Sequence, residues 1–164
     1  MSTDTPSEPT PEHDVPWLSP DQQRDWRALV ALIMALPPAL DAQLKRDAGV
    51  NVFEYHVLSA LSDAPNRTLV LSNLAALAQG SLSRISHAIT RLERSGCVER
   101  RSLPNRGGRH TEARLTDAGF AKLEEAAPHH VEGVRENLVD IADPADFAAV
   151  GRVFDAVAEK IGQR

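Results

Sequence analysis

Arginine side chains are concentrated in one part of this sequence, where they could bind a polyanion. Residues 80–114 contain eight arginines and three glutamates, a net charge of +5, although the whole chain of 164 residues has a formal net charge of −5. A local positive region on an acidic molecule is typical of a surface on which nucleic acid docks. Charge alone leaves a solvated arginine-rich surface as the alternative.

Residues 82–95 can place several of these groups on one face of a helix. Leu82, Ile85, Ile89 and Leu92 recur at helical spacing, and the opposite face is polar without an acidic residue. Side chains in the first turns of such a helix can reach base edges in the major groove, where arginine pairs with guanine. The residues that we expect to contact DNA from here are Ser81, Ser83, Arg84, Ser86, His87 and Arg91.

These assignments have competing interpretations. The serines can instead cap and solvate the helix. Arg91 can either touch a phosphate or pair with Glu93 or Glu99, and the sequence does not choose between them.

A glycine-rich hairpin follows this helix. Residues 97–101 and 111–115 alternate in the manner of strands, and Gly107 and Gly108 lie between them. Arg106 and Arg109 flank the glycines, so both guanidinium groups could reach the neighbouring minor groove or its phosphates. A short helix at 71–79, a turn at Gly80, the basic helix and this hairpin predict a winged helix-turn-helix.

Further helices surround this unit. We expect one from Ser19 as N-cap and Pro20 as first helical residue to Gly49, with a kink or short break at Pro37-Pro38. A second should cover 52–61. After Thr116 a long helix with an apolar seam from Phe120 to Ile141 should follow, bent locally by Pro128, and then a last helix from Pro144.

The apolar faces of the outer helices need a partner, either one another or a second subunit. A homodimer is favoured because two-fold symmetry matches a palindromic operator. The residues assigned to dimerisation are Trp17, Trp26, Ile33, Val131, Val134, Leu138, Phe147 and Phe154. For the two tryptophans, ligand binding is the alternative.

The predicted fold class is mainly α with a small β-hairpin wing. The expected divisions are a disordered acidic arm (1–18), an N-terminal dimerisation helix (19–50), a winged helix-turn-helix domain (51–116) and C-terminal dimerisation helices (117–164). The arm is acidic and rich in proline, and it is too poor in apolar residues to order itself.

Composition argues against several other classes of protein. The longest uncharged runs, Ala28–Leu40 and Thr68–Ser83, fall short of the roughly 18 apolar residues of a membrane span. The first sixteen residues contain no lysine or arginine, unlike a secretory signal. We therefore expect a soluble, cytoplasmic protein without a membrane partner.

No cluster of residues suggests catalysis or a metal site. Paired carboxylates, a nucleophile with its base and a phosphate-binding loop are all missing at usable spacing, so we expect no enzyme and no cofactor. Of the six histidines, His129 and His130 are adjacent, and a helix would point them about 100° apart; we therefore assign no metal site. Cys97, the single cysteine, is expected in the core, with a redox-sensing thiolate as the alternative.

The stretch Phe53–Leu115, with its run Arg91-Leu92-Glu93-Arg94-Ser95-Gly96-Cys97-Val98-Glu99-Arg100, resembles the MarR (multiple-antibiotic-resistance-type) family of bacterial regulators. Arg91-Leu92, Gly96, Val98, Arg100 and the run Leu115-Thr116-Asp117-Ala118-Gly119 match the family pattern in order and spacing. The family's wing usually carries an aspartate two residues before its arginine. Here Arg109 matches the arginine, but Gly107 replaces the aspartate, which removes an ion pair that could orient it.

The resemblance implies a homodimeric winged helix-turn-helix repressor, less often an activator, released from DNA by a small aromatic or phenolic effector or by oxidation. We therefore expect a sequence-specific transcriptional regulator that binds an inverted repeat in double-stranded DNA. The alternatives are a winged-helix protein-interaction module without DNA binding, or a redox-responsive regulator acting through Cys97. The ligand-binding residues cannot be read from one sequence, because a pocket needs side chains from several helices.

Overall fold

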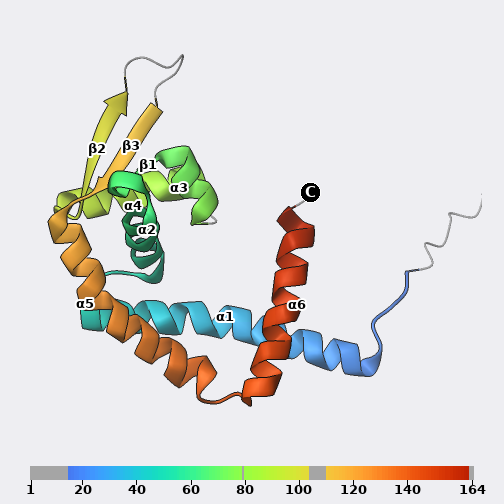
Figure 1. Ribbon diagram of the computed structural model, residues 1–164. Helices are drawn as coiled ribbons and strands as arrows, with labels where there is room; N and C mark the ends of the chain where they lie inside the picture. The colour runs from blue at the N-terminus through green and yellow to red at the C-terminus, as the bar shows by residue number, and fades with distance from the viewer. Residues whose placement is uncertain (1–14, 79, 104–109, 163–164) are drawn as a thin grey trace, which may run out of the picture. The chain divides into compact units, whose positions relative to one another are not determined.

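The computed structural model describes residues 15–78, 80–103 and 110–162, and it is mainly helical with one small sheet (Figure 1). This confirms the predicted fold class. The described chain divides after Met34 into two units, and each is treated by itself. The elements in chain order are α1 (Pro20–Ala48), α2 (Val52–Asp63), the 3₁₀ turn η1 (Pro65–Arg67), β1 (Thr68–Val70), α3 (Leu71–Leu77), α4 (Leu82–Arg94), β2 (Val98–Leu103), β3 (His110–Leu115), α5 (Asp117–Val134), the π-helical turn η2 (Arg135–Val139) and α6 (Pro144–Gly162).

The first unit contains the start of α1, which begins where the sequence predicts. The Ser19 hydroxyl accepts a hydrogen bond from the backbone N–H of Gln22 at 3.2 Å, and Gln22 Oε1 accepts one from the backbone N–H of Ser19 at 2.9 Å. This reciprocal capping satisfies two donors that a helix start otherwise leaves unpaired.

α1 is helical without interruption through Pro37 and Pro38, so the short break that the prolines suggested is not found. Each proline removes its own N–H from the helical ladder and its ring crowds the carbonyl four residues earlier, yet the helix continues through both. The last turns of α1 are also held by packing, because Leu44 and Ala48 are buried with Val50 and Ala126. Gly49 follows the helix with a φ of +72°, as expected of a residue that closes it.

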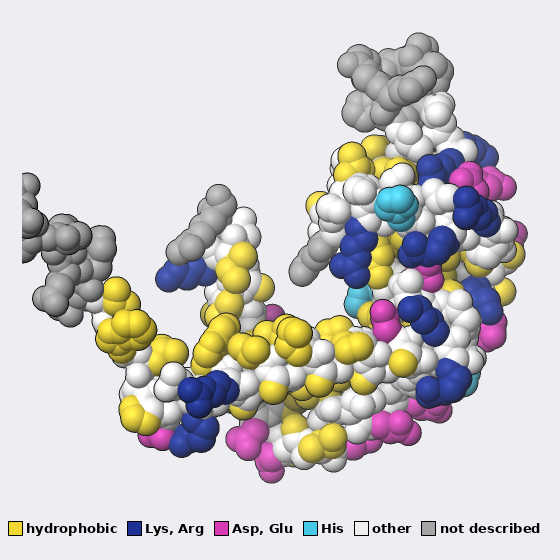
Figure 2. Space-filling model, turned by 180° about the vertical axis from the view of Figure 1, so that it is seen from behind, with side chains coloured by type: hydrophobic (Ala, Val, Ile, Leu, Met, Phe, Trp, Pro, Cys, Tyr) yellow, Lys and Arg dark blue, Asp and Glu magenta, His cyan; other side chains and the backbone are white. Residues whose placement is uncertain are grey.

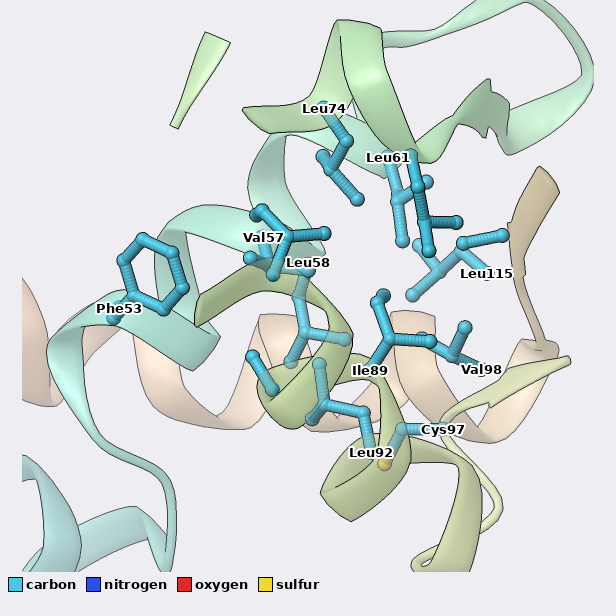
Figure 3. Close-up of a cluster of buried hydrophobic side chains, with 14 of the residues drawn as sticks. Phe53, Val57, Leu58, Leu61, Leu74, Ile89, Leu92, Cys97, Val98 and Leu115 are labelled. Atoms are coloured by element: carbon cyan, nitrogen blue, oxygen red, sulfur yellow. The ribbon is translucent and has the colours of Figure 1, made fainter. Parts of the chain in front are cut away.

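The winged-helix core is built from α2, α3, α4 and the sheet around one cluster of buried apolar side chains (Figure 3). The predicted inward residues of α4 are buried except Leu82, which is 57% exposed. Leu82 is the first residue of α4, and the buried residues of the helix begin one turn later, at Ile85. The fully buried large side chains of this cluster are Val57, Leu58, Leu61, Leu74, Ile85, Ile89, Val98 and Leu115.

The sheet is antiparallel, with strand order β1–β3–β2. The predicted hairpin pairs Val98 with Leu115 and Leu103 with His110. The sequence analysis missed β1, which adds a third strand by pairing Thr68 with Arg114 and Val70 with Glu112. Three residues are too short for an alternating pattern to identify, yet the third strand matters because a two-stranded hairpin alone is only marginally stable.

Thr116 and Gly119 join the wing to α5. The Thr116 hydroxyl donates to the carbonyl oxygen of Gly96 at 2.7 Å and accepts from the N–H of Gly119 at 3.0 Å. A Cβ on Gly119 would lie 2.0 Å from the carbonyl oxygen of Cys97. The backbone of α5 therefore approaches the start of the wing closer than any other residue type permits.

The long helix after Thr116 is less regular than predicted. α5 continues through Pro128, but residues 135–139 form a π-helical turn, and α6 begins at Pro144. No residue of α6 is buried; Phe147 is 37% and Phe154 is 44% exposed. α6 thus leaves its apolar residues open in the isolated chain.

Candidate nucleic-acid interface

α4 presents a polar, basic face on one side and packs into the core with the other. Ser81 caps the helix by accepting a hydrogen bond from the backbone N–H of Arg84 at 3.2 Å. Ile85, Ile89 and Leu92 hold the buried face. Lysine and arginine side chains gather over the winged-helix core, whereas hydrophobic side chains line α1 (Figure 2).

The structure brings most of the predicted contact residues of this helix into one groove of about 460 Å³. Ser86, which we predicted to contact DNA, does not line it; its carbonyl oxygen accepts a hydrogen bond from Arg100 of the wing. The residues lining the groove are Ser81, Ser83, Arg84, His87 and Arg91, together with Asp41, Asn51 and Phe53.

Arg84 stacks on an aromatic ring from α2. Its guanidinium carbon lies 4.0 Å from the centroid of the Phe53 ring, within the range of a cation–π interaction. A Cβ on Gly80 would lie 2.8 Å from Cζ of Phe53. Gly80 thus lets the ring reach the turn before α4, where it meets Arg84.

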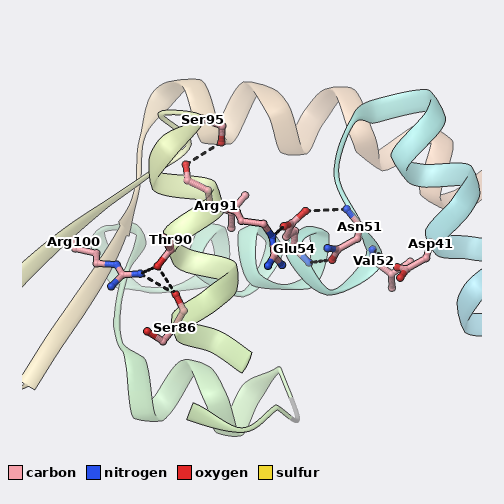
Figure 4. Close-up of polar contacts among 10 residues, drawn as sticks. Asp41, Asn51, Val52, Glu54, Ser86, Thr90, Arg91, Ser95 and Arg100 are labelled. Atoms are coloured by element: carbon pink, nitrogen blue, oxygen red, sulfur yellow. Dashed lines mark hydrogen bonds and ion pairs between the residues drawn. The ribbon is translucent and has the colours of Figure 1, made fainter. Parts of the chain in front are cut away.

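Arg91 pairs with a residue that sequence analysis did not identify. Its Nε donates to Oε1 of Glu54 at 2.5 Å, so the ion pair that the sequence left open is made with neither Glu93 nor Glu99 (Figure 4). Glu93 lies 3.3 Å from Nε of Arg100, and Glu99 lies 3.8 Å from Arg101. Periodicity cannot reveal this pairing, since Glu54 and Arg91 are 37 residues apart.

Glu54 is held in place by the start of α2. Its Oε2 accepts from the N–H of Asn51 at 3.0 Å, and Oδ1 of Asn51 accepts from the N–H of Glu54 at 2.8 Å. The next N–H, that of Val52, donates to Oδ1 of Asp41 at 2.8 Å. The Glu54 side chain is only 10% exposed, so its charge is compensated chiefly by Arg91. The Asn-x-x-Glu pattern is a capping signal in the sequence, but it says nothing of the contact with α4.

Arg100, which was not among the predicted DNA-contact residues, connects α4 to the wing. Nη2 of Arg100, on β2, donates to the carbonyl oxygen of Ser86 at 2.8 Å and also to the Thr90 hydroxyl (Figure 4). Arg100 matched the family pattern in the sequence, and the structure gives that match a physical role. The predicted wing residues Arg106 and Arg109 lie outside the described residues.

Cys97 is in the core, as predicted, with 5% of its surface exposed. The thiol lies beside a cavity of about 710 Å³ that is also lined by Lys45, Arg91 and Lys122. A redox sensor needs an accessible thiolate. The burial of Cys97 therefore disfavours the redox alternative.

His56 and His130 approach each other where α2 meets α5. Their ring centroids are 5.7 Å apart, and the ring of Tyr55 lies 4.4 Å from that of His130. Burial lowers the pKa of both histidines, and the charge of His56 lowers that of His130 further. Burial also raises the pKa of Tyr55. Within the described part of the chain, no three histidine, cysteine, aspartate or glutamate side chains are grouped to hold a metal ion.

The residues assigned to dimerisation are largely open in the single chain. Trp17 is 88%, Trp26 54%, Ile33 56% and Val131 54% exposed, while Val134 and Leu138 are half-buried. α1 also contains an 18-residue window with a mean hydropathy of 1.4, of which 6% is buried. By length and composition this window could cross a membrane, which the expectation from uncharged runs did not anticipate. Helices of soluble proteins meet the same criterion of length and composition, so the window alone does not identify a membrane-spanning helix.

Solved structures of bacterial regulators resemble this chain over most of its length. A MarR family transcriptional regulator from Streptomyces coelicolor, crystallised in complex with DNA, is 36% identical with a TM-score of 0.83, over 91% of this chain and 92% of that one. AbsC, a MarR family regulator from the same organism, is 29% identical with a TM-score of 0.81, over 92% of this chain and 100% of that one. A MarR family regulator from Silicibacter pomeroyi, 21% identical with a TM-score of 0.68 over 85% of this chain and 95% of that one, shares the fold. No protein-family model and no curated protein matches the sequence.

Proposed function

Because the chain belongs to the MarR family of transcriptional regulators, we propose that it is a sequence-specific DNA-binding repressor. In this proposal a homodimer binds an inverted repeat in double-stranded DNA, and a small aromatic or phenolic effector releases it. α4 enters the major groove and the wing reaches the adjacent minor groove. The protein performs no catalysis and acts in the cytoplasm.

The observation that carries the proposal is the exposed face of α4. Ser83, Arg84, His87 and Arg91 line one groove on that face, while Ile85 and Ile89 on the opposite face are completely buried. Arginine at such a position can donate two hydrogen bonds to guanine. The proposal is further supported by the DNA present in the crystal structure of the regulator that is 36% identical.

The dimer part of the proposal is supported by the apolar residues that the single chain leaves exposed. Trp26, Ile33, Phe147 and Phe154 are all more than one-third exposed. Exposed faces of this kind are typical of interfaces between subunits. We assign residues 19–50 and 117–164 to dimerisation and 51–116 to DNA binding. A second copy, rather than lipid, then covers the apolar window of α1.

The effector part is supported by a cavity of about 670 Å³ beside α2. Its lining is mostly apolar, with His56, Ser59 and Asp63 as polar residues, and its volume is in the range of small-molecule sites. A thermal-shift screen with phenolic carboxylates tests this part separately. An effector should raise the melting temperature and also weaken DNA binding.

Selection from a random duplex library tests the DNA-binding function. The purified full chain should enrich a sequence with two inverted half-sites about 10 base pairs apart. Binding to that sequence should weaken steeply with salt, because arginines displace counterions from phosphates. Sedimentation should give a dimer.

Two outcomes would favour the alternatives. Enrichment of no sequence, together with binding that is absent even in dilute salt, would favour a winged-helix protein-interaction module. Release from DNA by peroxide in the wild type but not in Cys97→Ser would favour the redox-responsive regulator.

A further inference from the structure

The first turn of α2 contacts the basic face of α4 at two points. Phe53 lies under the guanidinium of Arg84 at 4.0 Å, and the adjacent Glu54 binds Nε of Arg91 at 2.5 Å. Arg84 and Arg91 are seven residues apart on α4, which is about two helical turns, so they share one face. Two neighbouring residues of α2 therefore fix both arginines of the groove.

We propose that Phe53 and Glu54 are positioning residues for DNA recognition. Phe53 sets the selectivity for bases by orienting Arg84, and Glu54 sets the affinity for the phosphate backbone by orienting Arg91. This inference rests on the proposed DNA-binding function, and it adds two residues that act through the arginines instead of through contacts of their own.

Phe53 can orient Arg84 because the ring is itself held by packing. Phe53 is only 9% exposed and belongs to the buried cluster (Figure 3). A Cβ on Gly80 would lie 2.8 Å from Cζ of Phe53. A guanidinium stacked on a ring loses rotational freedom, but the N–H groups at its edge remain able to donate. A planar donor held in one orientation favours guanine, which offers two acceptors side by side in the major groove.

Glu54 can orient Arg91 because both oxygens of its carboxylate are bound. Oε2 is tied to the backbone of Asn51 while Oε1 holds Nε of Arg91. Among the described residues, the side chain of Arg91 makes no other hydrogen bond, so its two terminal nitrogens can bind a phosphate oxygen. The Arg91 side chain is 51% exposed, which leaves it open to a ligand.

The competing interpretation is that both residues only stabilise the fold, or that the negative charge of Glu54 repels DNA. If Phe53 and Glu54 only stabilise the fold, their substitution would weaken DNA binding whether or not Arg84 and Arg91 are present. Repulsion would make DNA binding tighter when the charge of Glu54 is removed. Double-variant comparisons distinguish these cases from positioning.

The experiment measures dissociation constants of the full chain on the duplex enriched by the wild type and on a scrambled duplex. We define the selectivity ratio as the dissociation constant on the scrambled duplex divided by that on the enriched duplex, and we expect Phe53→Leu to lower it about tenfold. In the Arg84→Ala background, Phe53→Leu should lower this ratio no further. If Phe53→Leu does not fold, Phe53→Met replaces it in the same comparison.

Glu54→Gln should weaken binding to both duplexes by about three- to tenfold and lower the slope of affinity against salt by up to about one. The same substitution should have no further effect in the Arg91→Ala background. Leu58→Ala is the matched control on α2: Leu58 is fully buried, so this variant should lower the melting temperature and leave selectivity and salt slope unchanged.

The inference would be overturned if Phe53→Leu had the same effect in the wild type and in the Arg84→Ala background. It would also be overturned if Glu54→Gln had the same effect in the wild type and in the Arg91→Ala background, or if Glu54→Gln made DNA binding tighter. An unchanged selectivity ratio in Phe53→Leu would overturn it as well. If the wild type enriches no sequence, the proposed function itself fails. If the wild type enriches a sequence and the variants behave like it, only the positioning role fails.

Discussion

The guanidinium of Arg100 binds the carbonyl oxygen of Ser86 at 2.8 Å and so joins the first strand of the wing to α4. The same carbonyl accepts the hydroxyl of Thr90, one helical turn later, at 2.8 Å. The wing and the helix proposed to bind DNA are thus connected by a charged hydrogen bond as well as by the apolar core. A rigid connection allows both elements to meet DNA in one geometry.

Arg100→Met tests this connection. Methionine keeps the apolar stem but removes the donors, so we expect a loss of about 1–2 kcal/mol in the free energy of unfolding. DNA binding should weaken on all sequences, since the wing is no longer fixed. Chemical denaturation and a binding titration measure the two effects. Wild-type stability in this variant would contradict the role assigned to Arg100.

Gly119→Ala tests the close approach of α5 to the wing. The added methyl group would overlap the carbonyl oxygen of Cys97, which is backbone and cannot move aside cheaply. We expect the variant to lose at least about 2 kcal/mol of stability in denaturant titrations. Gly151→Ala in α6 is the control, because a Cβ there meets nothing within 4 Å; it should change stability by less than about 1 kcal/mol.

The histidine pair predicts a dependence of stability on pH. In the unfolded chain His56 and His130 bind protons near their usual pKa of 6.5, whereas burial lowers both pKa values in the folded protein. Their contribution to the free energy of unfolding is therefore complete above pH 6.5 and is lost as the pH falls below that value. The reason is that, at the lower pH, the unfolded state binds more protons than the folded state.

Replacing one member of the pair should reduce this dependence. In His130→Gln, the free energy of unfolding should fall less than in the wild type between about pH 7.5 and about pH 5.5. Denaturant titrations at the two pH values give the comparison. An equal fall in both proteins would mean that His130 carries none of the effect.

Arg84 and Arg109 should differ in what they contribute to DNA binding. Arg84→Ala should cost about 1–3 kcal/mol on the selected sequence and relax the preference for it. Arg109→Ala should weaken all sequences alike and lower the salt slope by about one, as expected of a phosphate or minor-groove contact. Equal losses for Arg84→Ala on specific and random DNA would refute its role in reading bases.

Peroxide should not regulate this protein through its thiol. Cys97 is 5% exposed, and a buried thiol reacts slowly with oxidants. We expect wild type and Cys97→Ser to keep the same DNA affinity after peroxide treatment, measured by gel shift. Loss of binding in the wild type alone would restore the redox alternative.

The sequence by itself determined the helices and the face of α4 that is open. Ile85, Ile89 and Leu92 recur at the period of a helix, and that period alone places them in the core and Arg84 outside. Ser19 and Gly49 likewise mark the ends of α1 through local hydrogen bonding and backbone conformation. These features depend on residues only a few positions apart, so a linear pattern contains them.

Only the tertiary structure decided which side chains meet. The partner of Arg91 is Glu54 instead of a nearby glutamate, Arg84 rests on Phe53, and β1 pairs with a strand more than forty residues later. The apolar seam continues at helical spacing through residues 135–139, so the sequence pattern did not reveal the π-helical turn there. Such contacts depend on how α2, α4 and the sheet pack in three dimensions. That packing is a collective result of the whole core, and no local spacing of residue types encodes it.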